Sequence, residues 1–182
     1  MEFVQPIRDK NLIEDIKNEL LKNGSRDLML FVFGINTGLR ISDTLNLKVK
    51  DVKNRTHVVL IEKKTGKEKR FLINSNLRQQ IDPYIKNMND SDYLFKSREG
   101  NNRPLSRVQA YRIINNAIKK LGVLDKIGTH TLRKTFGYHH YQQFKDVAIL
   151  QSIFNHSAPS VTLRYIGIND DVKDITLEKF SL

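Results

Sequence analysis

The sequence of 182 residues contains no cysteine, which excludes disulfide bonds and thiolate chemistry. It also contains no long apolar run, since the longest, residues 28–35, is too short to span a bilayer. The N-terminus carries polar and acidic residues where a secretory segment needs an apolar stretch. No linker rich in proline, glycine and serine divides the chain. We therefore expect one cytoplasmic domain, long enough to bury a core and without a membrane partner.

Acidic residues are outnumbered by basic ones, with 20 Asp and Glu against 31 Lys and Arg and a net charge of +11. The basic residues are clustered, because residues 48–70 hold nine of them against three acids, and residues 96–134 hold ten against two. Neutralising phosphates with lysine and arginine releases counterions and drives binding. The charge pattern therefore predicts DNA as a partner, whereas the segment from residue 170 onwards is locally acidic.

Apolar residues recur with helical spacing along most of the chain, and small polar residues and glycine mark the expected helix ends. Pro83 should end or kink the helix that contains it. The predicted helices cover residues 12–21, 25–38, a short stretch from 43, 75–88, 106–121, 129–144, 147–154, 160–165 and 171–180. The predicted N-terminal caps are Ser25, Ser42, Thr129, Asp146, Ser160, and Asp170 or Asp171.

Two β-rich runs, residues 57–62 and 68–73, flank a Lys-Lys-Thr-Gly-Lys turn in which Gly66 can supply a positive φ. They predict an antiparallel hairpin, and residues 93–95 predict a third short strand. The expected fold class is α+β: a mostly helical domain with a small antiparallel hairpin or three-stranded sheet.

Six residues carry the groups that phosphodiester cleavage requires. The reaction needs positive charge at the two non-bridging oxygens, a nucleophile, and a proton for the leaving oxygen. Arginine suits the first task because its planar fork donates two parallel hydrogen bonds to phosphate. The six are Arg40 in Thr-Gly-Leu-Arg, Lys64 in Lys-Thr-Gly, His130 and Arg133 in His-Thr-Leu-Arg, His156, and Tyr165 nine residues later.

Each of these residues alone is more often an ordinary surface or packing residue, so the inference rests on their combination. Tyr165 is the predicted nucleophile, because neighbouring cations can favour its phenolate. Tyr138 and Tyr141 are rivals that we expect to pack. Adjacent histidines at 139 and 140 point in different directions on a helix and have no carboxylate cluster beside them. We therefore expect no metal site and no cofactor.

These motifs resemble the catalytic domain of the tyrosine recombinases, the phage-integrase family. Residues 37–43, Thr-Gly-Leu-Arg-Ile-Ser-Asp, are similar to the family's first arginine motif, and residues 64–66 match its hairpin lysine. Residues 130–136, His-Thr-Leu-Arg-Lys-Thr-Phe, are close to a family consensus. Residues 154–156, Phe-Asn-His, and 162–165, Thr-Leu-Arg-Tyr, resemble the family's closing segment, which runs from a histidine to a tyrosine.

The resemblance implies site-specific cleavage and rejoining of double-stranded DNA, as in integration and recombination, by a type IB mechanism without a metal. Tyr165 would attack the scissile phosphate to give a 3′-phosphotyrosyl link and a free 5′-hydroxyl. Lys64 would protonate the leaving 5′ oxygen, and His130 would assist proton transfer. The groups that would hold the phosphate are Arg40, Arg133 and His156.

The resemblance also implies where partners bind. In such enzymes the last helix commonly docks on a neighbouring subunit, so the helix at 171–180 is expected to mediate self-association on DNA. Its apolar face would be formed by Val172, Ile175 and Phe180. The location implied is the cytoplasm of a bacterium, nucleoid-associated, with a bacterial or phage origin. The basic residues expected to contact DNA are Lys63, Lys67, Lys69, Arg70, Arg103, Arg107 and Lys134.

The sequence departs from the family pattern at three places. Asn155 stands where the family usually has glycine, although asparagine tolerates the left-handed conformation. Asp43 replaces the usual glutamate. Only 36 residues precede the first motif, where relatives usually carry a separate core-binding domain. We therefore expect residues 1–182 to form a single catalytic domain without the core-binding domain, either excised or natural, with weak DNA affinity.

Other functions remain open at this stage. A type IB topoisomerase would share the chemistry but relax supercoils without site preference. A DNA-binding remnant or regulator that does not cleave is a further alternative, although the complete set of six groups argues against it. A metal-dependent nuclease is disfavoured, because no acidic cluster is evident in the sequence.

Overall fold

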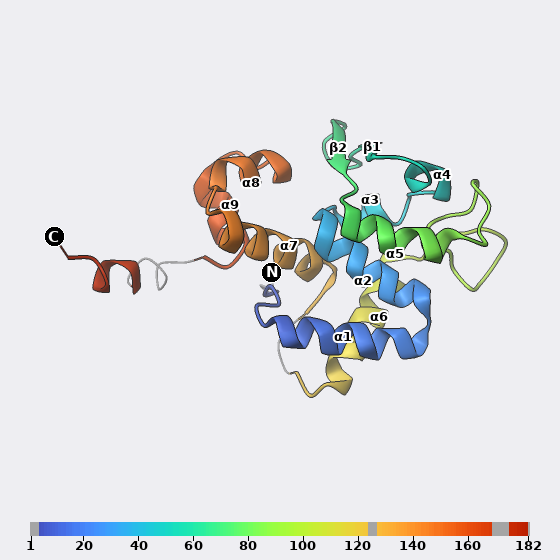
Figure 1. Ribbon diagram of the computed structural model, residues 1–182, viewed down its shortest axis with the longest axis horizontal. Coiled ribbons are helices and arrows are strands. Elements are labelled where there is room, and N and C mark those ends of the chain that lie inside the picture. The colour runs from blue at the N-terminus through green and yellow to red at the C-terminus, as the bar shows by residue number, and fades with distance from the viewer. Residues whose placement is uncertain (1–3, 124–126, 169–174, 182) are drawn as a thin grey trace.

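The computed structural model describes residues 4–123, 127–168 and 175–181. Figure 1 shows a mostly helical body with one β-hairpin. The elements in chain order are α1 (Lys10–Asn23), α2 (Ser25–Thr37), α3 (Ile41–Thr44), α4 (Val49–Val52), β1 (His57–Ile61), β2 (Glu68–Leu72), α5 (Ser75–Ile85), α6 (Arg107–Lys120), α7 (Thr129–Phe144), α8 (Val147–Phe154) and α9 (Pro159–Tyr165).

Helix α2 is the centre of the body, and α1, α5, α6 and α7 pack around it (Figure 1). Most of its side chains are buried, as expected for a helix that is apolar on nearly every side. Phe33 packs edge-on against Phe71 and Phe95, with ring centroids 6.0 and 5.7 Å away. Phe31 belongs instead to a second cluster formed with α1, α6 and α7. Helix α2 therefore joins two hydrophobic clusters into one core.

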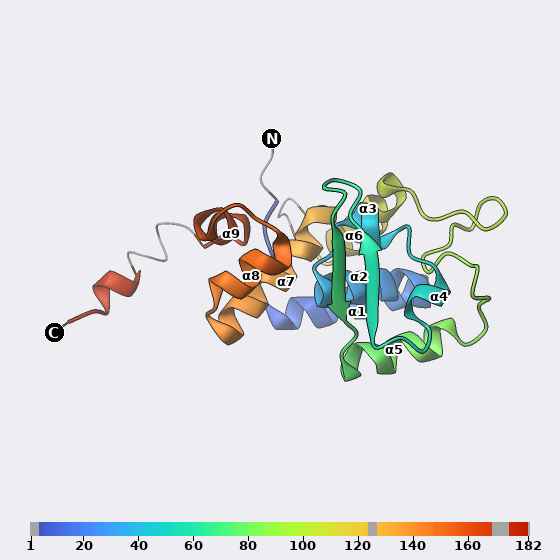
Figure 2. The same ribbon diagram turned by 90° about the horizontal axis from the view of Figure 1, so that it is seen from above.

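The hairpin forms as predicted, to within one residue at each strand end. Strands β1 and β2 pair antiparallel, from His57 opposite Leu72 to Ile61 opposite Glu68. Successive side chains alternate between the two faces. Residues 58, 60, 69 and 71 therefore face the body, and residues 57, 59, 61, 68, 70 and 72 face away. Gly66 has the expected positive φ, 67°. Figure 2 shows the two strands of the hairpin passing across α2, which β2 contacts through Phe71 and Phe33.

The predicted third strand is wrong. In the described residues the sheet has two strands, and Tyr93 forms only an isolated bridge with Lys48. The backbone N–H of Tyr93 donates to the Asn102 side chain at 3.1 Å, and that of Leu94 donates to the Leu47 carbonyl at 2.8 Å. Because local loops satisfy these backbone groups, the segment 93–95 has no need to join the hairpin.

The predicted helices up to residue 165 are present, but α4 was not predicted and several caps differ. Asp146 caps α8 as expected, accepting the N–H of Ile149 at 2.9 Å. Asn155 ends α8 in the left-handed conformation, with φ 54°. Four predicted caps, at positions 25, 42, 129 and 160, are wrong because each helix begins one or more residues earlier, and the actual N-caps are Gly24, Arg40, Gly128 and Ala158. Helix α9 begins at a proline, which suits the first helical position.

Helices α8 and α9 form a smaller cluster against the end of α7, around Leu150, Phe154 and Ile166. Figures 1 and 2 show this cluster at the opposite end of the body from α4, with residues 175–181 extending beyond it. In that segment residues 175–178 are helical, and Ile175 and Phe180 are 54% and 67% exposed. The rest of the predicted helix, residues 171–174 with Val172, lies outside the described residues. No helix within the described ranges has the length and apolar character needed to cross a membrane.

Close packing at Gly137 joins α7 to the smaller cluster. A Cβ at this position would lie 2.7 Å from both Ile166 Cγ2 and Phe154 Cε2, so α8 or α9 would have to shift. We expect Gly137→Ala to lower the free energy of unfolding by about 1–3 kcal/mol through overpacking. Gln143→Ala, on the exposed side of the same helix, should stay within about 0.5 kcal/mol of wild type. Urea unfolding measures both, and equal stabilities would contradict this packing argument.

Candidate active site

Arg133 is the most firmly held of the six candidate residues. It lies in α7 and is only 3% exposed. Its Nη1 donates to the Gly38 carbonyl, and its Nη2 donates to the Phe154 carbonyl at 2.9 Å. Gly38 ends α2 with φ 60° and lies against the Phe136 ring, so glycine is needed there. The two carbonyls fix the guanidinium at the junction of α2, α7 and α8.

Arg40 is held by a buried carboxylate. It is the N-cap of α3, and its Nη1 lies 2.6 Å from Oε1 of Glu62, which is 2% exposed. The other carboxylate oxygen accepts from the Thr65 hydroxyl at 2.8 Å. Burial acts to raise the pKa of Glu62, but the hydrogen bonds from Arg40 and Thr65 outweigh it, and the net pKa is lowered. Glu62 is therefore a carboxylate that orients the guanidinium of Arg40.

Lys64 lies at the exposed tip of the hairpin, as predicted. The tip is fixed at its base, because the Glu62 N–H donates to the Lys67 carbonyl at 2.9 Å and the Gly66 N–H donates to the Glu62 carbonyl at 2.8 Å. The Lys63 N–H donates to Oδ1 of the buried Asp43 at 3.1 Å, which links the tip to α3. These contacts hold the Lys64 ammonium close enough to act electrostatically on His130 and His156.

His156 and Tyr165 meet across the turn between α8 and α9. Their rings are edge-on, with centroids 5.1 Å apart, and His156 Nδ1 lies 3.0 Å from Oγ1 of Thr162. Burial first, and then the charges of Arg133 and Arg40, lower the pKa of His156 to about 4. The imidazole is therefore neutral at pH 7.

The Tyr165 phenol lies within electrostatic reach of the Arg133 guanidinium. Burial raises the pKa of this phenol above its ordinary value, and the positive charge of Arg133 opposes that rise only in part. His130, in the first turn of α7, has its pKa lowered by partial burial and then by the charges of Arg133 and Lys134. The structure thus brings all six candidate residues into one electropositive site.

The predicted DNA contacts fall into three groups. Arg70 is exposed, but it faces away from the site on the outer side of β2, where its Nη2 lies 3.2 Å from His57 Nδ1. Lys134 is 4% exposed and donates to the Val4 carbonyl at 2.8 Å, and Lys69 is largely buried and donates to the Ile153 carbonyl. Their burial revises the prediction for these two lysines. The exposed members are Lys63, Lys67, Arg103 and Arg107.

Glu62 is a residue of the site that was not predicted from the sequence. One signal was available in the sequence. Side chains at positions 58, 60 and 62 lie on the same face of the strand, so the pattern puts an acid, followed by two lysines, on the face that packs against the body.

The tyrosines at 138 and 141 do pack, as predicted, against the cluster of α8 and α9.

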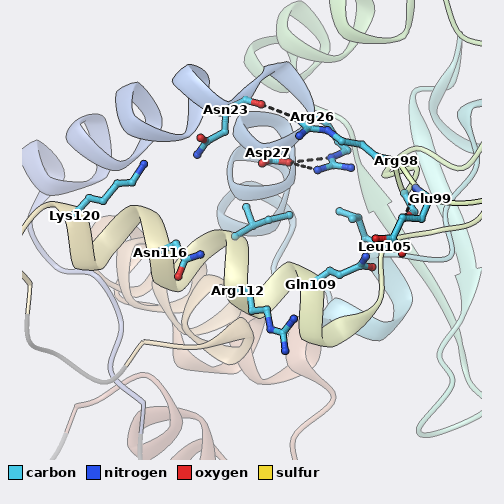
Figure 3. A pocket seen from close by; sticks show the side chains of 12 residues that line it. Asn23, Arg26, Asp27, Arg98, Glu99, Leu105, Gln109, Arg112, Asn116 and Lys120 are labelled. Carbon is cyan, nitrogen blue, oxygen red and sulfur yellow. Dashed lines mark hydrogen bonds and ion pairs between the residues drawn. The ribbon is translucent and has the colours of Figure 1, made fainter.

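A cavity of about 400 Å³ lies elsewhere, between α1, α2, α6 and the loop before α6 (Figure 3). Three of the four cations that line it have partners: Arg26 pairs with Asp27 at 2.8 Å, and Arg98 donates to the Asn23 carbonyl at 2.9 Å. Lys120 pairs with Glu19 at 3.0 Å. None of the six candidate residues lines this cavity.

Residues 8–171 match the phage integrase family. A probable integrase/recombinase of Bacillus subtilis, YoeC, is 54% identical over 171 residues, which cover 94% of this chain and 93% of that protein. Tyrosine recombinase XerA of Pyrococcus furiosus is 32% identical over 162 residues, 87% of this chain and 54% of XerA. The chain therefore spans nearly all of the first relative and about half of the second.

Solved structures agree on the fold. A crystal structure of XerA recombinase superposes with a TM-score of 0.78 at 20% identity, covering 100% of this chain and 66% of that one. A lambda integrase dimer bound to a COC′ core site gives a TM-score of 0.74 at 16% identity, covering 92% and 49%. The chain belongs to the phage integrase family of tyrosine recombinases, and it has the fold of their catalytic domain.

The lowered pKa of His156 predicts a pH dependence of stability. The pKa is about 4 in the folded protein and 6.5 for the unperturbed group, so acidification protonates the unfolded chain first. Stability contributed by the neutral imidazole is fully present above pH 6.5 and is lost as the pH falls toward 4. Between about pH 7 and pH 4.5, we expect His156→Gln to lose less unfolding free energy than wild type. Urea midpoints at both pH values test this, and equal losses would contradict it.

Proposed function

We propose that this chain cleaves and rejoins DNA strands through a covalent 3′-phosphotyrosyl link to Tyr165. The observation that carries the proposal is the position of Tyr165: its ring lies 5.1 Å from that of His156, within electrostatic reach of the Arg133 guanidinium, which two backbone carbonyls already fix. A nucleophile placed against the group that binds the phosphate is in position for attack. Membership of the tyrosine recombinases supports the same chemistry.

In the proposed step, the Tyr165 oxygen attacks phosphorus, and the bond from phosphorus to the 5′ oxygen breaks. The 5′ oxygen leaves with the bonding electron pair and takes a proton from the Lys64 ammonium. The phenolic proton passes to His130, whose lowered pKa keeps it neutral at pH 7 and able to accept it. A 5′-hydroxyl of a partner strand reverses the step, so the bond energy is conserved without ATP.

Positive charge for the transition state comes from side chains. Arg40 and Arg133 would each donate to a non-bridging oxygen, and His156 would add a hydrogen bond through Nε2, since its Nδ1 is engaged with Thr162. We propose that this charge makes a metal ion unnecessary. The exposed basic residues that would contact the DNA backbone are Lys63 and Lys67 at the hairpin tip, and Arg103 and Arg107.

The nucleophile can be tested by trapping the covalent complex. The protein is incubated in EDTA with nicked suicide substrates from candidate recombination sites, and a covalent band is sought on denaturing gels. We expect wild type to give the band and Tyr165→Phe to abolish it. Tyr138→Phe, a matched change on α7, should retain it. A band that survives in Tyr165→Phe, or one that requires a divalent ion, would contradict the proposal.

The role of Lys64 can be isolated with a modified leaving group. Lys64→Ala is expected to slow cleavage by about 10²–10⁴-fold, as for loss of a general acid. When sulfur replaces the bridging 5′ oxygen of the substrate, the 5′ group leaves as a thiolate, and this leaving group does not need that proton. We therefore expect sulfur to restore cleavage by Lys64→Ala. A rate that stays low with the sulfur substrate would show that Lys64 is not the acid.

We further propose that the C-terminal segment mediates self-association on DNA. Ile175, Leu177 and Phe180 are all more than half exposed, which is unusual for large apolar side chains clustered in one short segment. Replacing Ile175 and Phe180 together with serine is expected to reduce the protein bound per paired-site DNA from two copies to one. Sedimentation velocity on paired and single sites measures this, and unchanged stoichiometry would contradict the proposal.

A further inference from the structure

Lys69 is a buried lysine on the face of the hairpin that points toward the body. Its side chain is 12% exposed, and it lies on β2 opposite Leu60. Its Nζ donates to the Ile153 carbonyl and lies 3.6 Å from Oε1 of Glu62. The ammonium therefore joins the hairpin to the last turn of α8.

A cleft separates these two elements. Its volume is about 310 Å³, and it lies between β2 and the end of α8. Lys69 and Glu62 line one side, and Ile153 and Asn155 line the other. In the described part of the chain, the hydrogen bond of Lys69 to Ile153 is the one that crosses from the hairpin to α8. Without it, the anchoring contacts of the hairpin tip that the described residues show would lie on the α3 side, with Asp43 and Arg40.

The end of α8 is held by two cations on successive carbonyls. Lys69 binds the carbonyl of Ile153, and Arg133 binds that of Phe154 at 2.9 Å. Carbonyls at a helix C-terminus lack intrahelical partners and carry partial negative charge, so they favour cations. His156 follows this turn directly. The hairpin, through Lys69, and the phosphate-binding guanidinium of Arg133 are therefore both positioned by the same end of α8.

We propose that Lys69 is a positioning residue for the cleavage step: it holds the hairpin that carries Lys64 against α8. This inference rests on the proposed function of Tyr165 and Lys64. The α8 side remains fixed by Arg133 and by its buried Phe154 when Lys69 is removed. The hairpin is then the part that moves, and the general acid moves with it. Displacement of a catalytic group by about 1 Å can cost about 10²-fold in rate.

The electrostatic setting is consistent with this role. The charged groups that act on the ammonium are Glu62, which attracts it, and Arg133 and Arg40, which repel it. Burial first, and then repulsion by Arg133, lower the pKa of Lys69 to about 8. A side chain in this position is turned away from solvent, and a phosphate backbone on the surface would meet the exposed Lys67 instead.

The test separates positioning from DNA contact. Lys69→Met, Lys69→Arg, Lys67→Met and the surface control Lys86→Met are compared with wild type in three measurements. The first is the DNA dissociation constant over a range of salt concentrations. The second is the single-turnover cleavage rate at saturating DNA, and the third is that rate with the bridging 5′-sulfur substrate. Circular dichroism melts verify that each variant is folded.

For Lys69→Met we expect a dissociation constant and salt slope within about twofold of wild type, and cleavage slowed about tenfold or more. Sulfur should restore most of that loss, because a displaced general acid is no longer needed. Lys69→Arg, which keeps a cation, should retain more activity than Lys69→Met and identifies the role even if the methionine variant is unstable. Lys67→Met should instead weaken binding and lower the salt slope by about 0.9. Lys86→Met should match wild type.

Four outcomes overturn the inference. Weaker binding with a shallower salt slope in Lys69→Met would make Lys69 a DNA contact. An unchanged cleavage rate, or a loss that sulfur does not restore, would show that Lys69 does not act through Lys64. The last two results overturn only the role of Lys69, provided that wild type forms the covalent complex. Absence of that complex in wild type would overturn the proposed function together with this inference.

Discussion

The site depends on one buried arginine. Arg133 is 3% exposed, and its guanidinium donates to carbonyls at the ends of two different helices, Gly38 after α2 and Phe154 at the end of α8. Removing a buried charge-assisted pair leaves unsatisfied groups and is costly, so this arrangement is strongly fixed. The same contact joins the large helical core to the smaller cluster of α8 and α9. The candidate nucleophile on α9 is thus placed against a group that the core already holds.

The other charges of the site are mostly positive and repel one another. The pKa values of His130, His156, Lys69 and Arg133 are all lowered, in each case first by burial and then by neighbouring cations. Glu62 is the buried acid that offsets this repulsion, through Arg40 at 2.6 Å and Lys69 at 3.6 Å. A site in which several cations repel one another binds an anion favourably. A DNA phosphate fits that requirement and would relieve the repulsion.

Local patterns in the sequence were sufficient for most of the fold. The hairpin was predicted to within a residue because strand alternation and the Lys-Thr-Gly turn agree, and the helices follow from 3.6-residue periodicity. Helix starts were less certain, since a serine can cap a helix or lie inside it, as Ser160 does after Pro159. The predicted third strand is absent because the side chain of Asn102, nine residues later in the same loop region, satisfies the Tyr93 N–H.

The six candidate residues could be named from motifs because each motif lies at the end of an element. The contacts that hold these six residues in place could not be predicted from motifs, because they depend on backbone carbonyls and on burial. Lys69 and Lys134 looked like surface lysines in a basic sequence, and only tertiary packing shows that both point inward. Glu62 looked like the last residue of a strand, and only the fold places it against Arg40.

The central claim is that the phenolic oxygen of Tyr165 forms the covalent bond to the DNA phosphorus. Mass spectrometry of the trapped complex tests it most directly. Nuclease and trypsin digestion should leave a nucleotide joined through its 3′-phosphate to the peptide that begins at Tyr165, after cleavage at Arg164. The account predicts that mass shift on Tyr165 alone. A nucleotide on Tyr138 or Tyr141, or one attached through a 5′-phosphate, would contradict it.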